Sequence, residues 1–276
     1  MCRYAREFSM TREAKCPRAL IGAILVTAAF SAPGRADDTS PEPTLSASGS
    51  TSSTGTSAAC FDLAPAQGKT IELTRRATDF DLNGEPTETT SLPEVSVIGG
   101  EVEFEGHMAT ETLTTYTPVN SPAYTNKEYS RVTGPAELTQ YGGLSELVTA
   151  MVQSRSKSVF SPPLVLTLDR VPGVVGSRTF TMVVSTTING VEQQPLTITG
   201  FASATLIGFE KVTIPAGTFD ACRFEQKHQG PDGPTTTRWL LLGHGVELKA
   251  STPAFGDVGA SIVELTYLLI NGVVPK

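Results

Sequence analysis

The chain has 276 residues with 21 Lys+Arg and 28 Asp+Glu, which gives a formal net charge of −7. Loss of residues 1–36, which is expected below, would leave 15 Lys+Arg against 26 Asp+Glu, a net charge of −11. Such an acidic surface, without a cluster of basic residues, repels phosphate backbones and excludes nucleic acid as a partner.

The N-terminal segment predicts export. Basic residues precede a short apolar run, Ala19–Phe30, and Gly34-Arg35-Ala36 offers small residues for cleavage after Ala36. The run is too short for a stable transmembrane helix, so we expect a signal peptide over 1–36 and a periplasmic or extracellular protein. An uncleaved N-terminal membrane anchor is the alternative.

Residues 37–59 contain twelve Ser/Thr and a single large aliphatic residue, Leu45. This composition cannot bury enough apolar surface to offset its ordering entropy, and it predicts a disordered linker. A single β domain is expected from Cys60 to the C-terminus, over 60–276.

The domain is patterned mostly with period two. Three alternating stretches end in the hairpin dipeptides Asn83-Gly84, Asn189-Gly190 and Asn271-Gly272. The fold class predicted is mostly β: an antiparallel curved sheet, half-barrel or sandwich-like, with at most one or two short helices. A weak internal similarity indicates two related meanders, about 60–158 and 159–276. The alternative is that any all-β chain rich in β-branched residues shows similarity between its own segments without a true repeat. One helix is expected over Leu144–Val152, where apolar residues recur at i, i+3, i+4 and i+7.

The segment Val212–Cys222 predicts a strand, a tight turn and a second strand. Pro215 lacks a ladder donor, and Gly217 can adopt the positive φ that a reversal after Ala216 requires. Three residues in and after this segment are candidates for a pocket or a turn: Phe219, Trp239 and His244. The alternatives are a core position for Trp239 and a turn position between two glycines for His244.

Only Cys60 and Cys222 follow the signal peptide, and an exported chain with two cysteines is expected to join them in a disulfide. A catalytic thiol is the alternative, but Asp220, Arg223 and Glu225 do not make the surroundings of Cys222 electropositive.

No other pattern indicates catalysis or a cofactor. The histidines His107, His228 and His244 lack metal-ligand spacing, and no Gly-x-Ser-x-Gly elbow is present. The alternating acids Glu101, Glu103 and Glu105 are interpreted as the solvent face of a strand. We therefore expect no catalytic residue, no metal and no cofactor.

The chain resembles a diverse group of uncharacterised secreted bacterial proteins that share E-x-V-T-V-P-A-G-T-F-x-x-C followed by W-x-x-x-G-V-G. The matching pieces are Glu210–Cys222, Trp239 with Gly243-His244-Gly245, Cys60 with Pro65 and Gly68, and Pro162-Pro163 with Pro172 and Gly176. Thr179-Phe180 stands where the group has a Trp, and His244 replaces an aliphatic residue. The resemblance implies a β half-barrel similar in outline to periplasmic lipoprotein carriers, and it assigns no catalytic residues.

Three hypotheses on function follow. The first is a non-catalytic envelope protein that binds an apolar or lipid-like ligand on the concave face, since strands such as Ile262–Ile270 are apolar on both faces. The second is a structural or interaction module with an envelope protein as partner. The third, a hydrolase that uses His244 with a distant Ser or Asp, lacks a motif.

Overall fold

The computed structural model describes residues 55–227 and 233–275. The predicted signal peptide, residues 37–54 of the linker and His228 lie outside the described residues. The described part contains one 3-10 helix, η2 (Ser57–Cys60), and thirteen strands. The strands are β1 (Thr70–Phe80), β2 (Pro86–Phe104), β3 (His107–Tyr116), β4 (Tyr124–Gly134), β5 (Glu137–Val148), β6 (Gln153–Thr167), β7 (Val175–Ile188), β8 (Val191–Glu192), β9 (Leu196–Ile214), β10 (Gly217–Lys227), β11 (Thr236–Leu241), β12 (Glu247–Thr252) and β13 (Ser261–Ile270).

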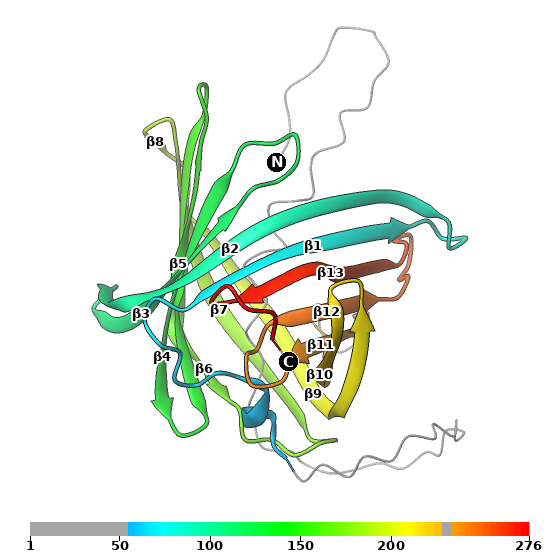
Figure 1. Ribbon diagram of the computed structural model, residues 1–276. Helices are drawn as coiled ribbons and strands as arrows, with labels where there is room; N and C mark the ends of the chain where they lie inside the picture. Colours follow the sequence, from blue (N-terminus) through cyan, green and yellow to red (C-terminus); the bar gives the residue numbers. More distant parts are fainter. Residues whose placement is uncertain (1–54, 228–232, 276) are drawn as a thin grey trace, which may run out of the picture.

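All strands belong to one antiparallel sheet, in the order β6-β5-β4-β3-β2-β1-β13-β12-β11-β10-β9-β7-β8. A further pairing of β6 with β7 joins the two ends, so that twelve strands form a closed ring and β8 extends β7 (Figure 1). The predicted mostly β, antiparallel curved sheet is confirmed, and it closes further than a half-barrel. Among the described residues, no helix is long and apolar enough to cross a membrane.

The Asn-Gly dipeptides all lie in turns, but with different geometry. Asn83-Gly84 lies in the loop between β1 and β2 with positive φ at Gly84 and not at Asn83, and Asn271-Gly272 follows β13, the last described strand. Asn189 and Gly190 have φ values of 50° and 80°, and they join β7 to β8 with both residues in the left-handed region that this type of turn needs. Pro215 and Ala216 join β9 to β10, and Gly217 has a φ of 142°. The Ala216 N–H donates to the Leu265 carbonyl at 3.1 Å, so the tip of this hairpin folds back onto β13.

The helix expected over Leu144–Val152 is wrong. Residues 144–148 belong to β5, which pairs with β4 and β6, and the remainder forms a turn closed by Thr149 and Val152. The helical stripe is not a buried face, because Val148 and Met151 are 62% and 87% exposed. Gly142 is a bulge residue rather than a helix start: its φ is 153°, and a Cβ there would lie 2.0 Å from a strand carbonyl.

The linker ends earlier than its composition indicated. Ser57 is fully buried, because its N–H donates to the Arg170 carbonyl and its hydroxyl to the Leu168 carbonyl, each at 2.8 Å. Cys60 follows within the same helix and forms the predicted disulfide with Cys222 of β10, with a Cα–Cα distance of 5.9 Å. Residues 55–59 are therefore part of the folded unit, and we call this attachment the N-terminal clasp.

The register separates an inward face from an outward face. Residues that pair directly across antiparallel strands share a face, which can be followed around the ring. The main apolar cluster lies on the inward face of β6, β7, β9 and β10, against the clasp, and we call it cluster A; it includes Cys60, Phe160, Leu164, Leu166, Phe180, Met182, Ala202, Leu206, Cys222 and Phe224. A second cluster joins β1 and β13 to the folded tip of the β9–β10 hairpin, with Leu73, Val212, Ile214, Phe219, Leu265 and Leu268.

The proposed border between two related halves, at residues 158 and 159, falls inside β6. Both residues pair with β5 and with β7, so the sheet is continuous across this border. The internal similarity stays a prediction.

Replacing Cys60 and Cys222 together by alanine should lower the free energy of unfolding by about 2–5 kcal/mol. The cross-link spans 162 residues and restricts the unfolded chain, and both cysteines are 0% exposed. Urea unfolding monitored by circular dichroism measures the effect. Reduction of the wild-type protein should reproduce it, and equal midpoints for the oxidised protein and the variant would contradict a stabilising clasp.

A candidate ligand cleft between β6 and β7

The ring of strands opens along one seam. β6 and β7 pair from Ser154 with Ile188 as far as Phe160 with Met182. Beyond that point β6 continues with β5 alone and β7 with β9 alone. The two strands therefore diverge toward the loop 168–174 that connects them.

A pair of prolines explains where the strands part. Pro162 and Pro163 lack an N–H and remove two successive donors from β6. The ladder to β5 is interrupted at the same place, because its register moves from Gly142 with Val159 to Gln140 with Leu164. The interruption fixes the position of the opening in the wall.

A cavity of about 280 Å³ occupies this opening. It is lined by Pro162, Pro163, Leu164, Val165, Thr167, Arg178, Thr179 and Phe180. Leu164 and Phe180 are buried members of cluster A, so the floor of the cavity is continuous with the main apolar core. Arg178 is the ionisable residue among these lining residues. We call this site the β6–β7 cleft.

Exposed valines occur in the cleft and in or beside the loop that joins its two strands. Val165 is 43% exposed, and Val171, Val174 and Val175, in or beside the connecting loop, are 52%, 43% and 59% exposed. A group of exposed apolar side chains next to a cavity is a common feature of binding sites.

Another part of the inward face is polar. One row of directly paired positions crosses six successive strands, β2 to β7: Ser96, Thr114, Asn126, Ser145, Ser156 and Thr186. Neighbours in this polar row hydrogen-bond in three pairs, at 2.8 Å, 2.6 Å and 3.0 Å. The concave face is therefore not uniformly apolar, and cluster A is its main apolar part.

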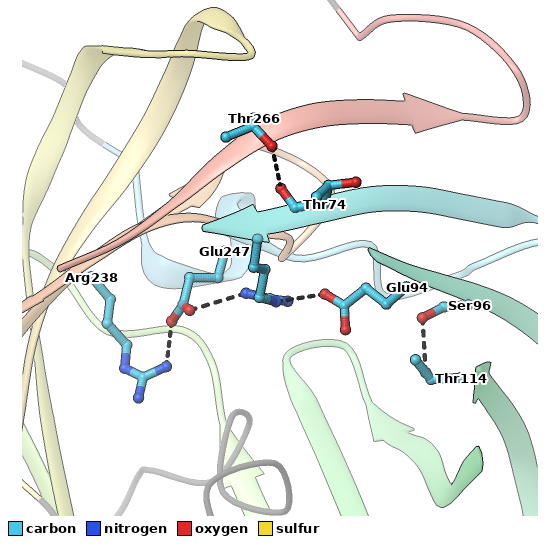
Figure 2. A network of polar contacts seen from close by, with 8 residues as sticks. Thr74, Glu94, Ser96, Thr114, Arg238, Glu247 and Thr266 are labelled. Atoms are coloured by element: carbon cyan, nitrogen blue, oxygen red, sulfur yellow. Dashed lines mark hydrogen bonds and ion pairs between the residues drawn. The ribbon is translucent and has the colours of Figure 1, made fainter. Parts of the chain in front are cut away.

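A network of charges lies beside the polar row and connects β2, β1, β12 and β11 (Figure 2). The Arg75 guanidinium donates to Glu94 at 2.5 Å and to Glu247 at 3.1 Å, and Arg238 also donates to Glu247. Both carboxylates are buried, at 5% and 6% exposed. Burial acts to lower the pKa of Arg75, but the charges of Glu94 and Glu247 outweigh it and raise this pKa above its ordinary value. Each buried charge is thus compensated by an opposite one.

Glu128 faces the same interior from β4. Solvent reaches its side chain, yet the surrounding protein and the negative charge of Glu94 raise the pKa of Glu128 above its ordinary value. Tyr116 and Tyr124 stack with ring centroids 4.6 Å apart, and burial, followed by the charge of Glu94, raises the pKa of both phenols. Water reaches this side of the interior, but the surrounding protein solvates a charge less well than bulk water does. An additional negative charge there is therefore disfavoured.

The structure does not bring the three predicted pocket or turn residues together. Trp239 is on the outward face, half-buried at the edge of the second cluster, and its Nε1–H donates to Glu210 at 2.6 Å. The cationic groups of Arg223 and Lys249 lie 5.9 Å and 5.8 Å from its ring. Phe219 is buried in the second cluster at 2% exposed. Neither residue lines the β6–β7 cleft.

His244 belongs to the clasp. It lies in the turn between β11 and β12, where the N–H groups of Gly243 and Gly245 donate to the carbonyls of Ala59 and Cys60. Its Nδ1 is 3.4 Å from Lys69 Nζ, which is paired with Asp62 at 2.7 Å. Burial, and then the charge of Lys69, lower the pKa of His244. The polar partner of its Nδ1 is thus the Lys69 ammonium, not a serine hydroxyl or a thiol.

The remaining candidates are on the surface. Glu101, Glu103 and Glu105 are exposed at the end of the β2–β3 hairpin, as expected of a solvent face. His107 is the first residue of β3, and its ring stacks on that of Tyr141 with the centroids 4.6 Å apart. In residues 55–227 and 233–275, no group of three acidic, His or Cys side chains could hold a metal ion.

Sequence reasoning missed the cleft. Pro162-Pro163 and Thr179-Phe180 were singled out for the resemblance alone, and Arg178 was not singled out. The available signal was the proline pair itself, since two adjacent prolines in a strand indicate an interruption of its ladder.

Replacing Glu247 by glutamine should destabilise the fold by about 3 kcal/mol, because the Arg75 and Arg238 guanidinium groups would lose the carboxylate that they share. Glu264→Gln is the matched control: Glu264 also contacts two cations, Lys249 and Arg76, but on the outward face, so its loss should cost at most about 1 kcal/mol. Denaturant unfolding compares the two variants, and equal costs would show that the interior network does not stabilise the fold.

Replacing Glu128 by glutamine should raise stability at neutral pH. The pKa of Glu128 in the folded state lies above the unfolded value of 4.5, so the folded state holds the proton more tightly. The stability of the wild-type protein therefore falls as pH rises from the unfolded pKa through the folded pKa. The gain should disappear at pH values below about 4, where both states are protonated. Thermal midpoints measured across pH test this, with Glu146→Gln on the exposed side of β5 as the control; a gain independent of pH would refute the assignment.

No family model matches the sequence, and no curated protein matches it at a significant level. Two solved structures are similar. One, from Bacteroides fragilis NCTC 9343, is described as "a putative exported protein with YmcC-like fold": it is 13% identical, the match covers 76% of this chain and 99% of that chain, and the TM-score is 0.37. The other, "a putative lipoprotein from Parabacteroides distasonis ATCC 8503", is 12% identical, with 79% and 100% covered and a TM-score of 0.36. At this level of similarity neither structure indicates a ligand or an activity for this chain.

Proposed function

We propose that this protein is an exported, non-catalytic component of the cell envelope that binds an apolar or lipid-like ligand in the β6–β7 cleft. The expected signal peptide over residues 1–36 and the buried disulfide support export, since disulfides persist in oxidising compartments. The observation that carries the binding role is the cavity of about 280 Å³ at the seam of the ring.

The construction of the cleft supports an apolar occupant. Leu164 and Phe180 connect its floor to cluster A, so an apolar chain entering the cleft would extend the existing core rather than displace it. Pro162 and Pro163 present no N–H, which leaves fewer polar backbone groups for such a chain to desolvate. The exposed Val165 side chain would lose contact with water on binding.

The size of the cleft limits what it holds. Cavities for drug-sized molecules have volumes of about 300–1,000 Å³. A site of about 280 Å³ is just below that range, so it accommodates one end of a larger ligand while the rest stays outside. The polar row and charge network across the interior would not favour an apolar chain passing further along the inward face.

Replacing Val165 by tryptophan should weaken binding of an apolar probe about tenfold, because the larger ring fills the cleft and removes contact area worth roughly 1.5 kcal/mol. Val95→Trp is the matched control, since Val95 is 42% exposed on the outward face of β2, against 43% for Val165. A fluorescent long-chain alcohol titrated into each protein provides the dissociation constants.

Native mass spectrometry of the mature protein, purified without detergent, complements the titration. Extra mass that organic solvent extracts as lipid would support the proposal. A bare monomer mass, together with equal or undetectable probe binding in all three proteins, would overturn it and favour a role in binding another envelope protein.

A further inference from the structure

From the exposed apolar side chains and the internally bonded turn at one end of the ring, we infer that this end docks onto the surface of a lipid bilayer. The site consists of residues 117–123, 147–154 and 188–191, and we call it the apolar tip. The inference goes beyond the proposed function and does not depend on it, because the β6–β7 cleft lies beyond the opposite end of the β6–β7 pairing.

Strand pairing brings the three segments of the apolar tip to the same end of the ring. The loop before β4 ends next to Tyr124, which pairs with Leu147 near the end of β5. The start of β6 is bound to the turn after β7, since the Gln153 N–H donates to the side-chain oxygen of Asn189 and the Asn189 N–H donates to the Gln153 carbonyl, each at 2.7 Å. The apolar tip therefore lies at the end of the ring where β8 is labelled (Figure 1).

Large apolar side chains project into solvent from the apolar tip. Met151 is 87% exposed, and Val119, Val148 and Val191 are 64%, 62% and 62% exposed. The three segments contain no Asp, Glu, Lys or Arg. Contact with an apolar medium therefore removes apolar area from water and requires no charge of the tip to be desolvated.

The turn between β5 and β6 bonds its own polar groups. The Thr149 N–H donates to the Val152 carbonyl at 2.8 Å, and the Thr149 hydroxyl accepts from the N–H groups of Met151 and Val152 at 3.2 Å and 2.8 Å. The Asn189 side-chain amide donates to the Met151 carbonyl at 3.4 Å. Lipid chains supply no hydrogen-bond partners, so a segment that enters them must satisfy its backbone internally. This turn meets that requirement.

The same features favour a bilayer over a protein as the partner. A specific protein interface carries about one hydrogen bond per 100–200 Å² of buried surface. The N–H groups of Thr149, Met151 and Val152 are already bonded within the tip, so they are not available for such bonds. A fluid bilayer adapts to side chains that project from separate turns, whereas a protein surface would need matching hollows.

Docking through the apolar tip leaves the β6–β7 cleft accessible. Residues 154–160 of β6 separate the two sites, a distance of roughly 20 Å along an extended strand. Apolar side chains at a membrane surface are buried to a depth of about 5–10 Å. The cleft thus stays outside the bilayer when the tip is inserted.

Vesicle flotation of the mature protein measures the docking. The wild type should bind phosphatidylcholine vesicles, which carry no net charge, and should stay bound in about 0.5 M NaCl because the attraction is apolar. Met151→Ser with Val191→Ser should weaken binding at least about tenfold, as expected when two apolar side chains are removed from the contact. Met108→Ser with Val273→Ser is the control of identical composition: both residues are exposed, at 44% and 66%, and lie outside the tip, so binding should equal that of the wild type.

Fluorescence locates the contact. The emission of Met151→Trp should move to shorter wavelength on vesicle binding and should be quenched by lipids brominated in their acyl chains. Met108→Trp should show neither change, and the wild type gives the baseline from Trp239. Thermal unfolding of all variants checks that each remains folded.

Each outcome decides the inference. Failure of the wild type to bind phosphatidylcholine vesicles, equal binding by the tip and control variants, or binding that about 0.5 M NaCl abolishes would overturn it. Self-association of the wild type that Met151→Ser with Val191→Ser abolishes, without vesicle binding, would assign the tip to a second copy of the chain and also overturn it. Vesicle binding by a protein that does not bind the fluorescent alcohol would overturn the proposed function and leave this inference intact.

Discussion

The pairing of β6 with β7 is the constraint on which the rest of the structure depends. Without it the thirteen strands would form an open sheet with two free edges, which exposes unpaired backbone groups to other chains. With it, the inward face becomes an interior and the clasp gains a core to pack against. The same pairing ends at Pro162-Pro163, so the feature that closes the ring also determines where the ring stays open.

Closure of the ring creates an interior that is apolar in one part and polar in another. Apolar residues of cluster A fill the side next to the clasp, and hydroxyls, amides and a four-membered charge network line the other side. A ring of about eight strands is just filled by side chains, whereas twelve strands enclose more space than short residues such as Ser96 and Ser156 can fill. Polar side chains on that part of the inward face keep their solvation, which explains why a wide ring tolerates them.

Much of the fold could be predicted from the sequence because its determinants are local. Alternating residues and Asn-Gly dipeptides specify strands and turns within a few positions, and Cys60 and Cys222 were the two cysteines left to pair. The prediction of a helix over Leu144–Val152 was wrong because the apolar residues follow a helical spacing by coincidence, and Gly142 before them is a bulge residue of β5. The polar row and the cleft could not be predicted, because each member looks like an ordinary strand residue. Register across six strands aligns Ser96 with Thr186, and folding brings Arg75 to Glu247, 172 positions away.

The clasp has a consequence for the order in which the protein matures. Its first described residues bind to Cys222, Gly243 and Gly245, which leave the ribosome long after Cys60 does. The native partner of Cys60 therefore becomes available only after about 160 further residues have been synthesised, and the intervening sequence offers no other cysteine. Cleavage of the expected signal peptide would also remove Cys2 and Cys16, which would leave a single possible pairing within one chain and no need for reshuffling by an isomerase.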